Sequence, residues 1–215
     1  MPAPLLPLVA LLGLGAGALA LWRGRRKDAD GPTTGEGGAP SAPSPKQGPV
    51  TDKELALELQ RRDAAGWAPL FEEAEKRHGL PPGLISAIGS RETGMQDIVG
   101  DGGHGRGVLQ MDDRSQRAWL KTQGADAPGA KPPVAAAAMH AGEILVEAMA
   151  FARKNAVALE DELKFSLSAY NAGPAGALKG YHAGDSDRGT TKQNYGADVL
   201  RRWRGMGYGP DGRVA

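Results

Sequence analysis

Cysteine is absent from the 215 residues of the chain. Its absence excludes disulfide bonds, thiol catalysis and the cysteine-based zinc frameworks. It assigns no cellular compartment, because many exported bacterial proteins also lack cysteine.

An excess of charge of one sign is missing too. Lysine and arginine together number 26 and aspartate and glutamate 25, so the formal net charge is +1. A chain without a strong basic field does not attract polyanions as a whole. Nucleic acid is therefore not an expected partner.

Metal-binding and serine-hydrolase patterns are also lacking. The histidines form neither an H-E-x-x-H motif nor a pair four residues apart, and they are His78, His104, His140 and His182. No serine stands in the nucleophile-elbow pattern. We predict neither a metal nor another cofactor.

The N-terminal 27 residues contain an uncharged apolar run. Residues 4–22 carry no charge, and about 20 apolar residues span a bilayer. Residues 18–20 resemble a signal-peptide cleavage site, but the basic residues follow the apolar run instead of preceding it. This segment is either a signal peptide or a membrane anchor, and an uncleaved anchor would leave the rest of the chain cytoplasmic by the positive-inside rule.

The next boundaries follow from composition. Residues 28–50 contain five glycines and five prolines and are expected to be a solvated linker. Residues 51–208 then form one domain with a single core, and 209–215 form a tail. We expect the chain after Gly205 to be loose.

Apolar spacing and stop residues predict a mainly helical domain. The first helix begins at a cap on Asp52, the second covers 68–78 and stops at Gly79, and the third opens at Pro81 and Pro82. Residues 114–133 are expected to be irregular, with Trp119 either packed on the domain or stacked on a sugar. Residues 134–154 form the longest helix, which we expect to be central and buried.

Three further helices complete the domain. One apolar stripe steps by four residues through Leu159, Leu163 and Leu167 to Asn171, and Pro174 starts a short helix. Thr190 or Thr191 caps the last helix, whose outward residues are expected to be Arg201, Arg202 and Arg204. The polar turn at 184–189 begins like a calcium loop, but its twelfth position is glycine, so calcium binding is rejected.

Glu92 is a candidate general acid at the end of the third helix. It lies four and eight residues after Ile88 and Leu84, so it shares their apolar face, and Gly94 ends the helix. Burial and the negative end of the helix dipole should both raise the pKa of Glu92. The alternative for Glu92 alone is a structural ion pair with a nearby arginine.

A glycine-rich loop follows the third helix. Six glycines lie from Gly94 to Gly107, too many for a helix or regular strand. Residues 108–112 alternate like a short strand, so Asp101 and Asp112 are expected to face Glu92 across a cleft. A protonated acid and an ionised carboxylate suit glycoside hydrolysis, although turn formation or capping explains either aspartate alone. The G-x-G-x-x-G match at 100–105 follows a helix instead of a strand, which excludes dinucleotide binding.

Four motifs resemble the goose-type lysozymes and the related soluble lytic transglycosylases. They are Ser90-Arg91-Glu92-Thr93, Gly107-Val108-Leu109-Gln110-Met111-Asp112, Ser168-Ala169-Tyr170-Asn171-Ala172-Gly173, and a C-terminal segment with Gly189-Thr190-Thr191, Tyr195 and Asp198-Val199. The resemblance implies a lysozyme-like α+β fold, mainly α-helical, with a small β element beside the active-site cleft.

The resemblance also implies an activity and roles for residues. The substrate would be the glycan strand of peptidoglycan, cut at the β-1,4 bond after N-acetylmuramic acid. Glu92 would be the general acid, Asp101 and Asp112 would position water, and the substrate-binding residues would be Gln110, Tyr170, Asn171 and Tyr195. The interval between Glu92 and Asp101 is shorter than in vertebrate members.

Two other activities stay open. A lytic transglycosylase cleaves the same bond and leaves 1,6-anhydromuramic ends, whereas both aspartates favour hydrolysis with inversion. A glycan-binding or virion structural module would have no need of Glu92. We expect a monomeric catalytic domain that is extracytoplasmic in a bacterium, either membrane-anchored through residues 4–22 or secreted, or associated with a phage.

Overall fold

The structure, a computed structural model, describes residues 50–209. The predictions for 1–27, for the linker up to residue 49 and for the end of the tail lie outside these residues. Within them the chain is mainly helical with one small antiparallel sheet, as predicted. The elements are α1 (Asp52–Ala64), α2 (Ala68–His78), α3 (Leu84–Thr93), β1 (Val99–Gly100), β2 (Gly105–Arg106), β3 (Met111–Asp112), α4 (Arg117–Thr122), α5 (Val134–Lys154), α6 (Glu162–Ala172), α7 (Pro174–His182) and α8 (Tyr195–Gly205), with short 3-10 turns at Asp101–Gly103, Leu159–Asp161, Ser186–Gly189 and Thr191–Gln193.

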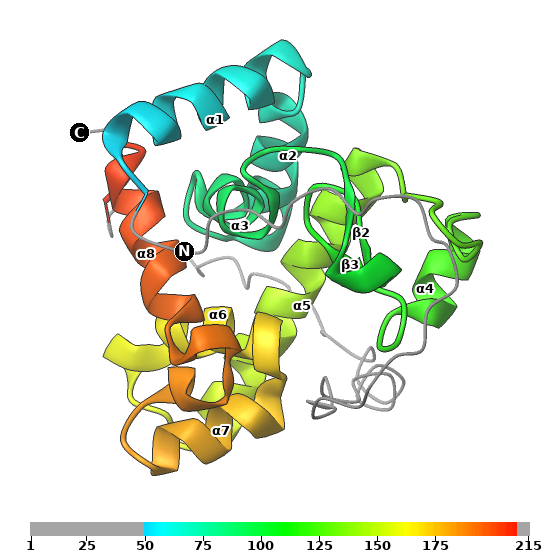
Figure 1. Ribbon diagram of the computed structural model, residues 1–215. Helices are drawn as coiled ribbons and strands as arrows, with labels where there is room; N and C mark the ends of the chain where they lie inside the picture. Colours follow the sequence, from blue (N-terminus) through cyan, green and yellow to red (C-terminus); the bar gives the residue numbers. More distant parts are fainter. Residues whose placement is uncertain (1–49, 210–215) are drawn as a thin grey trace, which may run out of the picture.

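Helices α5 and α8 connect the two ends of the molecule. Figure 1 shows α1, α2 and α3 together at one end, α6 and α7 at the other, and the sheet with α4 to one side. Helix α5 contacts α2 and α6, and α8 contacts α3 and α6. Segments distant in sequence therefore meet in the middle of the fold.

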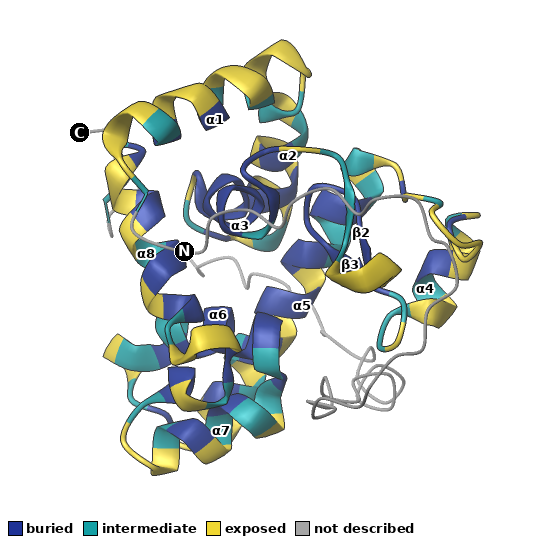
Figure 2. Ribbon diagram, in the orientation of Figure 1, coloured by how far each residue is buried: buried dark blue, intermediate teal, exposed yellow. Residues whose placement is uncertain are grey.

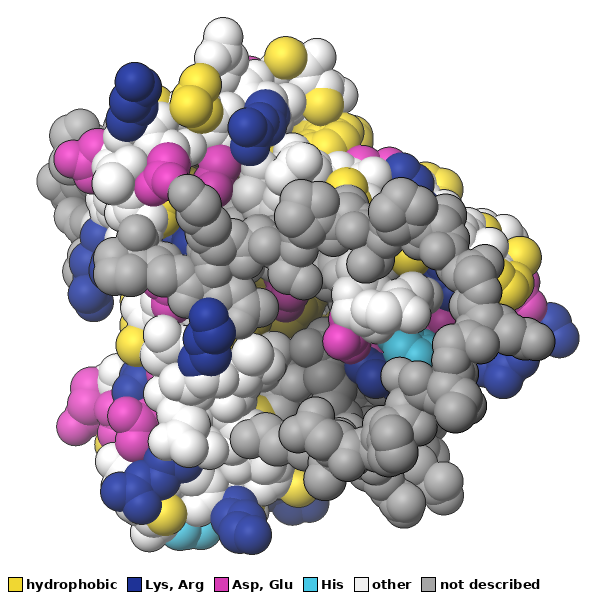
Figure 3. Space-filling model, in the orientation of Figure 1, with side chains coloured by type: hydrophobic (Ala, Val, Ile, Leu, Met, Phe, Trp, Pro, Cys, Tyr) yellow, Lys and Arg dark blue, Asp and Glu magenta, His cyan; other side chains and the backbone are white. Residues whose placement is uncertain are grey.

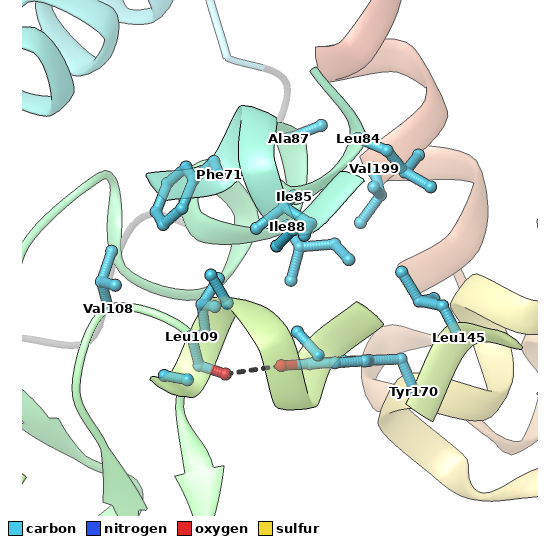
Figure 4. Close-up of a cluster of buried hydrophobic side chains, with 14 of the residues drawn as sticks. Phe71, Leu84, Ile85, Ala87, Ile88, Val108, Leu109, Leu145, Tyr170 and Val199 are labelled. Atoms are coloured by element: carbon cyan, nitrogen blue, oxygen red, sulfur yellow. Dashed lines mark hydrogen bonds between the residues drawn. The ribbon is translucent and has the colours of Figure 1, made fainter. Parts of the chain in front are cut away.

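Helix α3 is the most deeply buried helix that bears a candidate residue. All of its residues except Glu92 are buried, and Leu84 and Ile88 are 0% exposed (Figure 2). The apolar side chains around it come from α2, α5, α6, α8 and the loop before β3 (Figure 4). A helix packed on every side holds its last residues in a defined place.

The ends of the first three helices follow local rules. Thr51 caps α1 in a capping box with Glu54, so the predicted cap on Asp52 is wrong by one residue. Helix α2 has the predicted bounds and stops at Gly79, which has a φ of 63°. Helix α3 begins after Gly83, whose left-handed conformation, with a φ of 80°, separates the helix from the two prolines before it.

The sheet is smaller than the alternating sequence predicted. Strands β1, β2 and β3 are neighbours in this order, with Gly100 opposite Gly105 and Gly105 opposite Asp112. The predicted strand 108–112 is reduced to its last two residues, because Gln110 has a φ of 49° and its amide donates to the carbonyl of Gly107. A tight turn therefore replaces the first part of the strand.

Two connections also differ from expectation. The predicted irregular segment 114–133 contains α4, whose Leu120 is fully buried. Trp119 packs against the main core and stacks on His140, with ring centroids 4.3 Å apart, which agrees with the packing alternative. Leu159 is 80% exposed in a 3-10 turn, so it does not belong to the predicted apolar stripe.

Helix α5 has the predicted bounds and lies at the centre of the fold. Its buried side includes Ala138, Ala141 and Leu145, each 0% exposed. Eight of its 21 residues are buried, so the prediction of a buried helix holds for one side of it only. Among the described residues it alone is long and apolar enough to cross a membrane.

The last helix begins later than predicted. Helix α8 starts at Tyr195 rather than near Thr190, although the Thr190 hydroxyl still accepts a hydrogen bond from the Tyr195 amide at 3.2 Å. Arg202 was predicted to face outward but is 2% exposed, because it meets buried acidic partners. Met206 and Tyr208 pack against the main core, so the chain is not loose directly after Gly205.

Candidate active site

Glu92 is half-buried near the end of α3 and contacts a residue of the last helix, α8. The hydroxyl of Tyr195, the first residue of α8, donates a 2.6 Å hydrogen bond to Oε1 of Glu92. The two residues are 103 positions apart in the sequence. The fold thus brings together two residues predicted to belong to one site.

Tyr195 is a buried, neutral hydrogen-bond donor. Its side chain is 1% exposed, and burial together with the negative charge of Glu92 raises the pKa of Tyr195 well above its ordinary value. Its ring stacks on Tyr170 with centroids 6.4 Å apart. The hydroxyl therefore keeps its proton and acts as the donor in its hydrogen bond to Glu92.

Tyr170 links this pair to the loop before β3. Its hydroxyl donates a 2.9 Å hydrogen bond to the carbonyl oxygen of Leu109 (Figure 4). Leu109 is 0% exposed and is followed directly by Gln110. Tyr170 is 8% exposed, so the contact ties α6 to the loop inside the core.

Gln110 lies against the glycines of the sheet. Its Nε2 donates to the carbonyls of Gly107 at 2.8 Å and Ile98 at 3.2 Å. A Cβ at Gly100 or Gly105 would come within 2.3 Å or 2.1 Å of Oε1 of Gln110. At least these two glycines of the loop leave the space that the Gln110 side chain occupies. A role of Gln110 in substrate binding stays a prediction.

Asp101 and Asp112 are brought together by an arginine that the motif analysis missed. Nη2 of Arg114 contacts Oδ2 of both aspartates, at 2.7 Å for Asp112, and its Nε is 3.0 Å from Oδ1 of Asp112. Asp112 is buried, whereas Asp101 is exposed and has a φ of 51°. The two predicted aspartates thus form one cluster around Arg114.

A second cluster of charged side chains lies next to it. Asp113 accepts hydrogen bonds from His104 at 2.8 Å and from Arg106 at 2.6 Å. Burial alone would raise the pKa of Asp113, but these hydrogen bonds outweigh burial and lower it. Figure 3 shows acidic, basic and histidine side chains gathered beside the small sheet.

Asn171 is used inside the fold. Its Oδ1 accepts a 2.9 Å hydrogen bond from the amide of Thr191, and the residue is 6% exposed. This agrees with a helix-end amide bonded to backbone, and it ties α6 to the segment that leads into Tyr195. A contact between Asn171 and sugar stays a prediction.

Sequence reasoning also missed the buried aspartate that accepts hydrogen bonds from the first amides of α8. Asp187 is 1% exposed, and its carboxylate accepts from the amides of Gly196 at 2.7 Å and Ala197 at 2.9 Å. A carboxylate at a helix N-terminus stabilises the unpaired amides there. Its position eight residues before Tyr195 gave no sequence signal, because the turns between them bring it back.

The described residues contain no group of three or more histidine, aspartate or glutamate side chains that could hold a metal ion. The site chemistry can be carried by the carboxylates, the tyrosine hydroxyls and Arg114. Such a set can move protons and orient a water molecule.

The chain is similar to lysozyme g of Struthio camelus. The two are 30% identical over 151 residues, which cover 67% of each chain. The chain belongs to the goose-type lysozyme family. No family model matches the chain. Membership in the goose-type lysozymes agrees with the helical fold and with the four motifs from which the resemblance was inferred.

Proposed function

We propose that this goose-type lysozyme is a muramidase. It hydrolyses the β-1,4 bond between N-acetylmuramic acid and N-acetylglucosamine in peptidoglycan. The observation that carries the proposal is the position of Glu92, the one residue of α3 that is not buried, with the Tyr195 hydroxyl on Oε1. The name of the relative, lysozyme g, supports the same activity.

In this mechanism Glu92 is the general acid. It gives its proton to the glycosidic oxygen as the bond from that oxygen to the sugar C1 breaks. Tyr195 fixes the rotamer of Glu92 through Oε1, which leaves the proton to be held on the other oxygen. General acid catalysis of this kind contributes about 100- to 10,000-fold to the rate.

Asp101 and Asp112 position the attacking water in an inverting reaction. An inverting glycosidase needs room for that water between its carboxyl groups, which are about 6.5 to 9.5 Å apart in such enzymes. Two carboxylates held by one arginine favour hydrolysis over attack by the muramoyl 6-hydroxyl. The substrate is then the peptidoglycan glycan strand, and the setting is extracytoplasmic or phage-associated.

Mass spectrometry of digestion products tests the proposal. The full chain is incubated with purified peptidoglycan beside Glu92→Gln and a control, Glu72→Gln, which changes an exposed glutamate of α2. We expect reducing muramic ends from the wild type and the control, and almost none from Glu92→Gln. Equal digestion by Glu92→Gln would contradict the mechanism.

The same spectra separate the other activities. Anhydro ends, lighter by one water, would identify a lytic transglycosylase and make the aspartates structural. Absence of any product, with binding to peptidoglycan retained, would identify a glycan-binding module.

A further inference from the structure

Arg114 joins two carboxylates that differ sharply in exposure. The side chain of Asp112 is 4% exposed, that of Asp101 is 56% exposed, and that of Arg114 is 46% exposed. The arginine thus reaches from a buried acid to one at the surface. Its cation also removes the repulsion that two neighbouring carboxylates would otherwise have.

Asp112 is the anchor of this arrangement. Its Oδ1 accepts from the backbone amide of Arg114 at 2.8 Å and from Nε at 3.0 Å, and its Oδ2 accepts from Nη2 at 2.7 Å. Backbone and side chain of Arg114 are therefore held by the same carboxylate. The planar guanidinium makes this two-point contact with a fixed direction, which a lysine ammonium lacks.

Asp101 is the end of the arrangement that faces solvent. Arg114 holds its Oδ2, and among the described residues Oδ1 has no hydrogen-bond partner. A carboxylate fixed through one oxygen and open at the other can accept a hydrogen bond from water. Asp112 already gives both of its oxygens to Arg114.

We propose that Arg114 is a positioning residue for hydrolysis, which transmits the rigid position of Asp112 to Asp101, the aspartate that contacts the attacking water. The inference rests on the proposed muramidase function. Glu92 protonates the glycosidic oxygen, the bond from that oxygen to C1 breaks, and the water oxygen bonds to C1. The proton of the water passes to Oδ1 of Asp101 and later returns to Glu92 through solvent.

The side-chain hydrogen bonds of Asp112 and its negative charge raise the pKa of Arg114 above its ordinary value, although partial burial opposes them. The guanidinium is therefore a permanent cation and takes no part in proton transfer. Arg114 therefore contributes to the position of Asp101 and not to proton transfer, so its effect on the rate can be measured separately from that of Glu92.

Kinetics of the full chain on purified peptidoglycan test the role of Arg114. We expect Arg114→Ala to lower kcat for hydrolysis by about 10-fold or more, since a misplacement of ~1 Å can cost about 100-fold, with KM little changed. The share of anhydro ends should rise, because an unheld water competes less well with the 6-hydroxyl. Arg114→Lys should recover part of the rate. Arg77→Ala, which removes an exposed arginine paired with Glu73, is the matched control and should act as wild type.

A double-mutant cycle distinguishes transmission from simple electrostatics. If Asp112 acts through Arg114, Asp112→Asn should lower kcat little further when Arg114 is already alanine. Asp101→Asn alone should lower kcat as much as Arg114→Ala does. The proposal would be overturned if the fold-losses of kcat in Asp112→Asn and Arg114→Ala multiplied in the double variant. So would a wild-type rate in Arg114→Ala, or in Arg114→Lys if the alanine variant does not fold. Reducing muramic ends made by the wild type and lost in Glu92→Gln in the same series show that the muramidase proposal itself still holds.

Discussion

Nε of Arg91 lies 2.9 Å from Oδ2 of Asp198, and the two side chains are 3% and 4% exposed. Arg91 precedes Glu92, and its guanidinium carbon lies 5.2 Å from the ring centroid of Tyr195. Asp198 is three residues after Tyr195. A buried ion pair therefore fixes α3 to α8 immediately beside the contact between Glu92 and Tyr195.

The pair belongs to a larger buried network. Oδ2 of Asp198 also meets Nε of Arg202 at 3.2 Å, and Nη1 of Arg202 lies 2.8 Å from Oγ of Ser90. Ser90 in turn donates a hydrogen bond to Glu58 of α1, and burial raises the pKa of Glu58. The network joins α1, α3 and α8 behind the candidate acid.

Removal of Asp198 should strongly destabilise the protein. Asp198→Ala leaves Arg91 and Arg202 buried without their shared carboxylate, and an uncompensated buried charge costs about 3 to 5 kcal/mol. Urea unfolding measures the change. Asp126→Ala, at an exposed position, should stay within about 0.5 kcal/mol of wild type. Equal stability of the two variants would contradict the role of the network.

Tyr195→Phe should reduce catalysis and leave the ring contact with Tyr170 in place. A hydrogen bond to a charged group contributes about 1.5 to 3 kcal/mol, which corresponds to about 10- to 100-fold in rate if the bond is needed in the transition state. The measurement is kcat on purified peptidoglycan. Tyr181→Phe is the control, because the Tyr181 hydroxyl accepts a hydrogen bond from the backbone amide of Ala158 instead of contacting Glu92. The idea fails if both variants lose the same activity.

Glu75 should make stability depend on pH. It is 2% exposed and accepts from the amides of Gly83 at 2.8 Å and Ile85 at 2.7 Å, at the start of α3. Burial raises its pKa from 4.5 to about 7, although these amides oppose the shift. The folded state therefore binds a proton more tightly than the unfolded state, so the contribution of Glu75 to stability falls as pH rises from 4.5 to about 7.

Glu75→Gln should remove this dependence. A shift of this size changes the free energy of unfolding by about 3 kcal/mol across the interval. We expect the wild type to lose stability relative to Glu75→Gln as the pH of urea unfolding is raised through that range. Glu73→Gln, which alters an exposed residue of the same helix, should follow the wild type. Parallel curves for Glu75→Gln and wild type would refute the prediction.

Gly105→Ala should displace Gln110. The new Cβ would lie 2.1 Å from Oε1 and 2.8 Å from Cδ of Gln110, whose amide is held by two backbone carbonyls. Overpacking of this kind costs about 1 to 3 kcal/mol. The double variant Gly105→Ala with Gln110→Ala should lose less stability than the sum of the single variants in thermal unfolding. An additive loss would mean that Gln110 is not what Gly105 accommodates.

The helices could be predicted where their ends follow local rules. Helices α2 and α5 have the predicted bounds, because glycine at one end and apolar periodicity are properties of the segment itself. The turn that replaces the first part of the predicted strand 108–112 could not be predicted, since the residue type of Gln110 gives no sign of its positive φ. The start of α8 was missed because the acceptor for its first amides, Asp187, lies eight residues before Tyr195 and is brought back to the helix by the turns between them.

In the candidate site, too, features set by the local sequence could be predicted and features set by contacts across the fold could not. Glu92 could be located from the spacing of its apolar neighbours, whereas its contact with Tyr195 depends on the packing of α3 against α8. Arg202 was assigned to the surface because charge on a helix is usually solvated, but Asp198 and Glu58 surround it here. Partners across the fold decide whether a charged residue is buried, and a single sequence does not name them.

The separation of Glu92 and Tyr195 by 103 positions has a consequence for the order of synthesis. Contacts between distant positions form only after the intervening chain has been made and closed into a loop. Helix α8 is the last of the described helices to emerge, so Glu92 receives its hydroxyl partner only when the domain is nearly complete. A growing or truncated chain that stops before α8 would thus carry Glu92 without the hydroxyl that orients it.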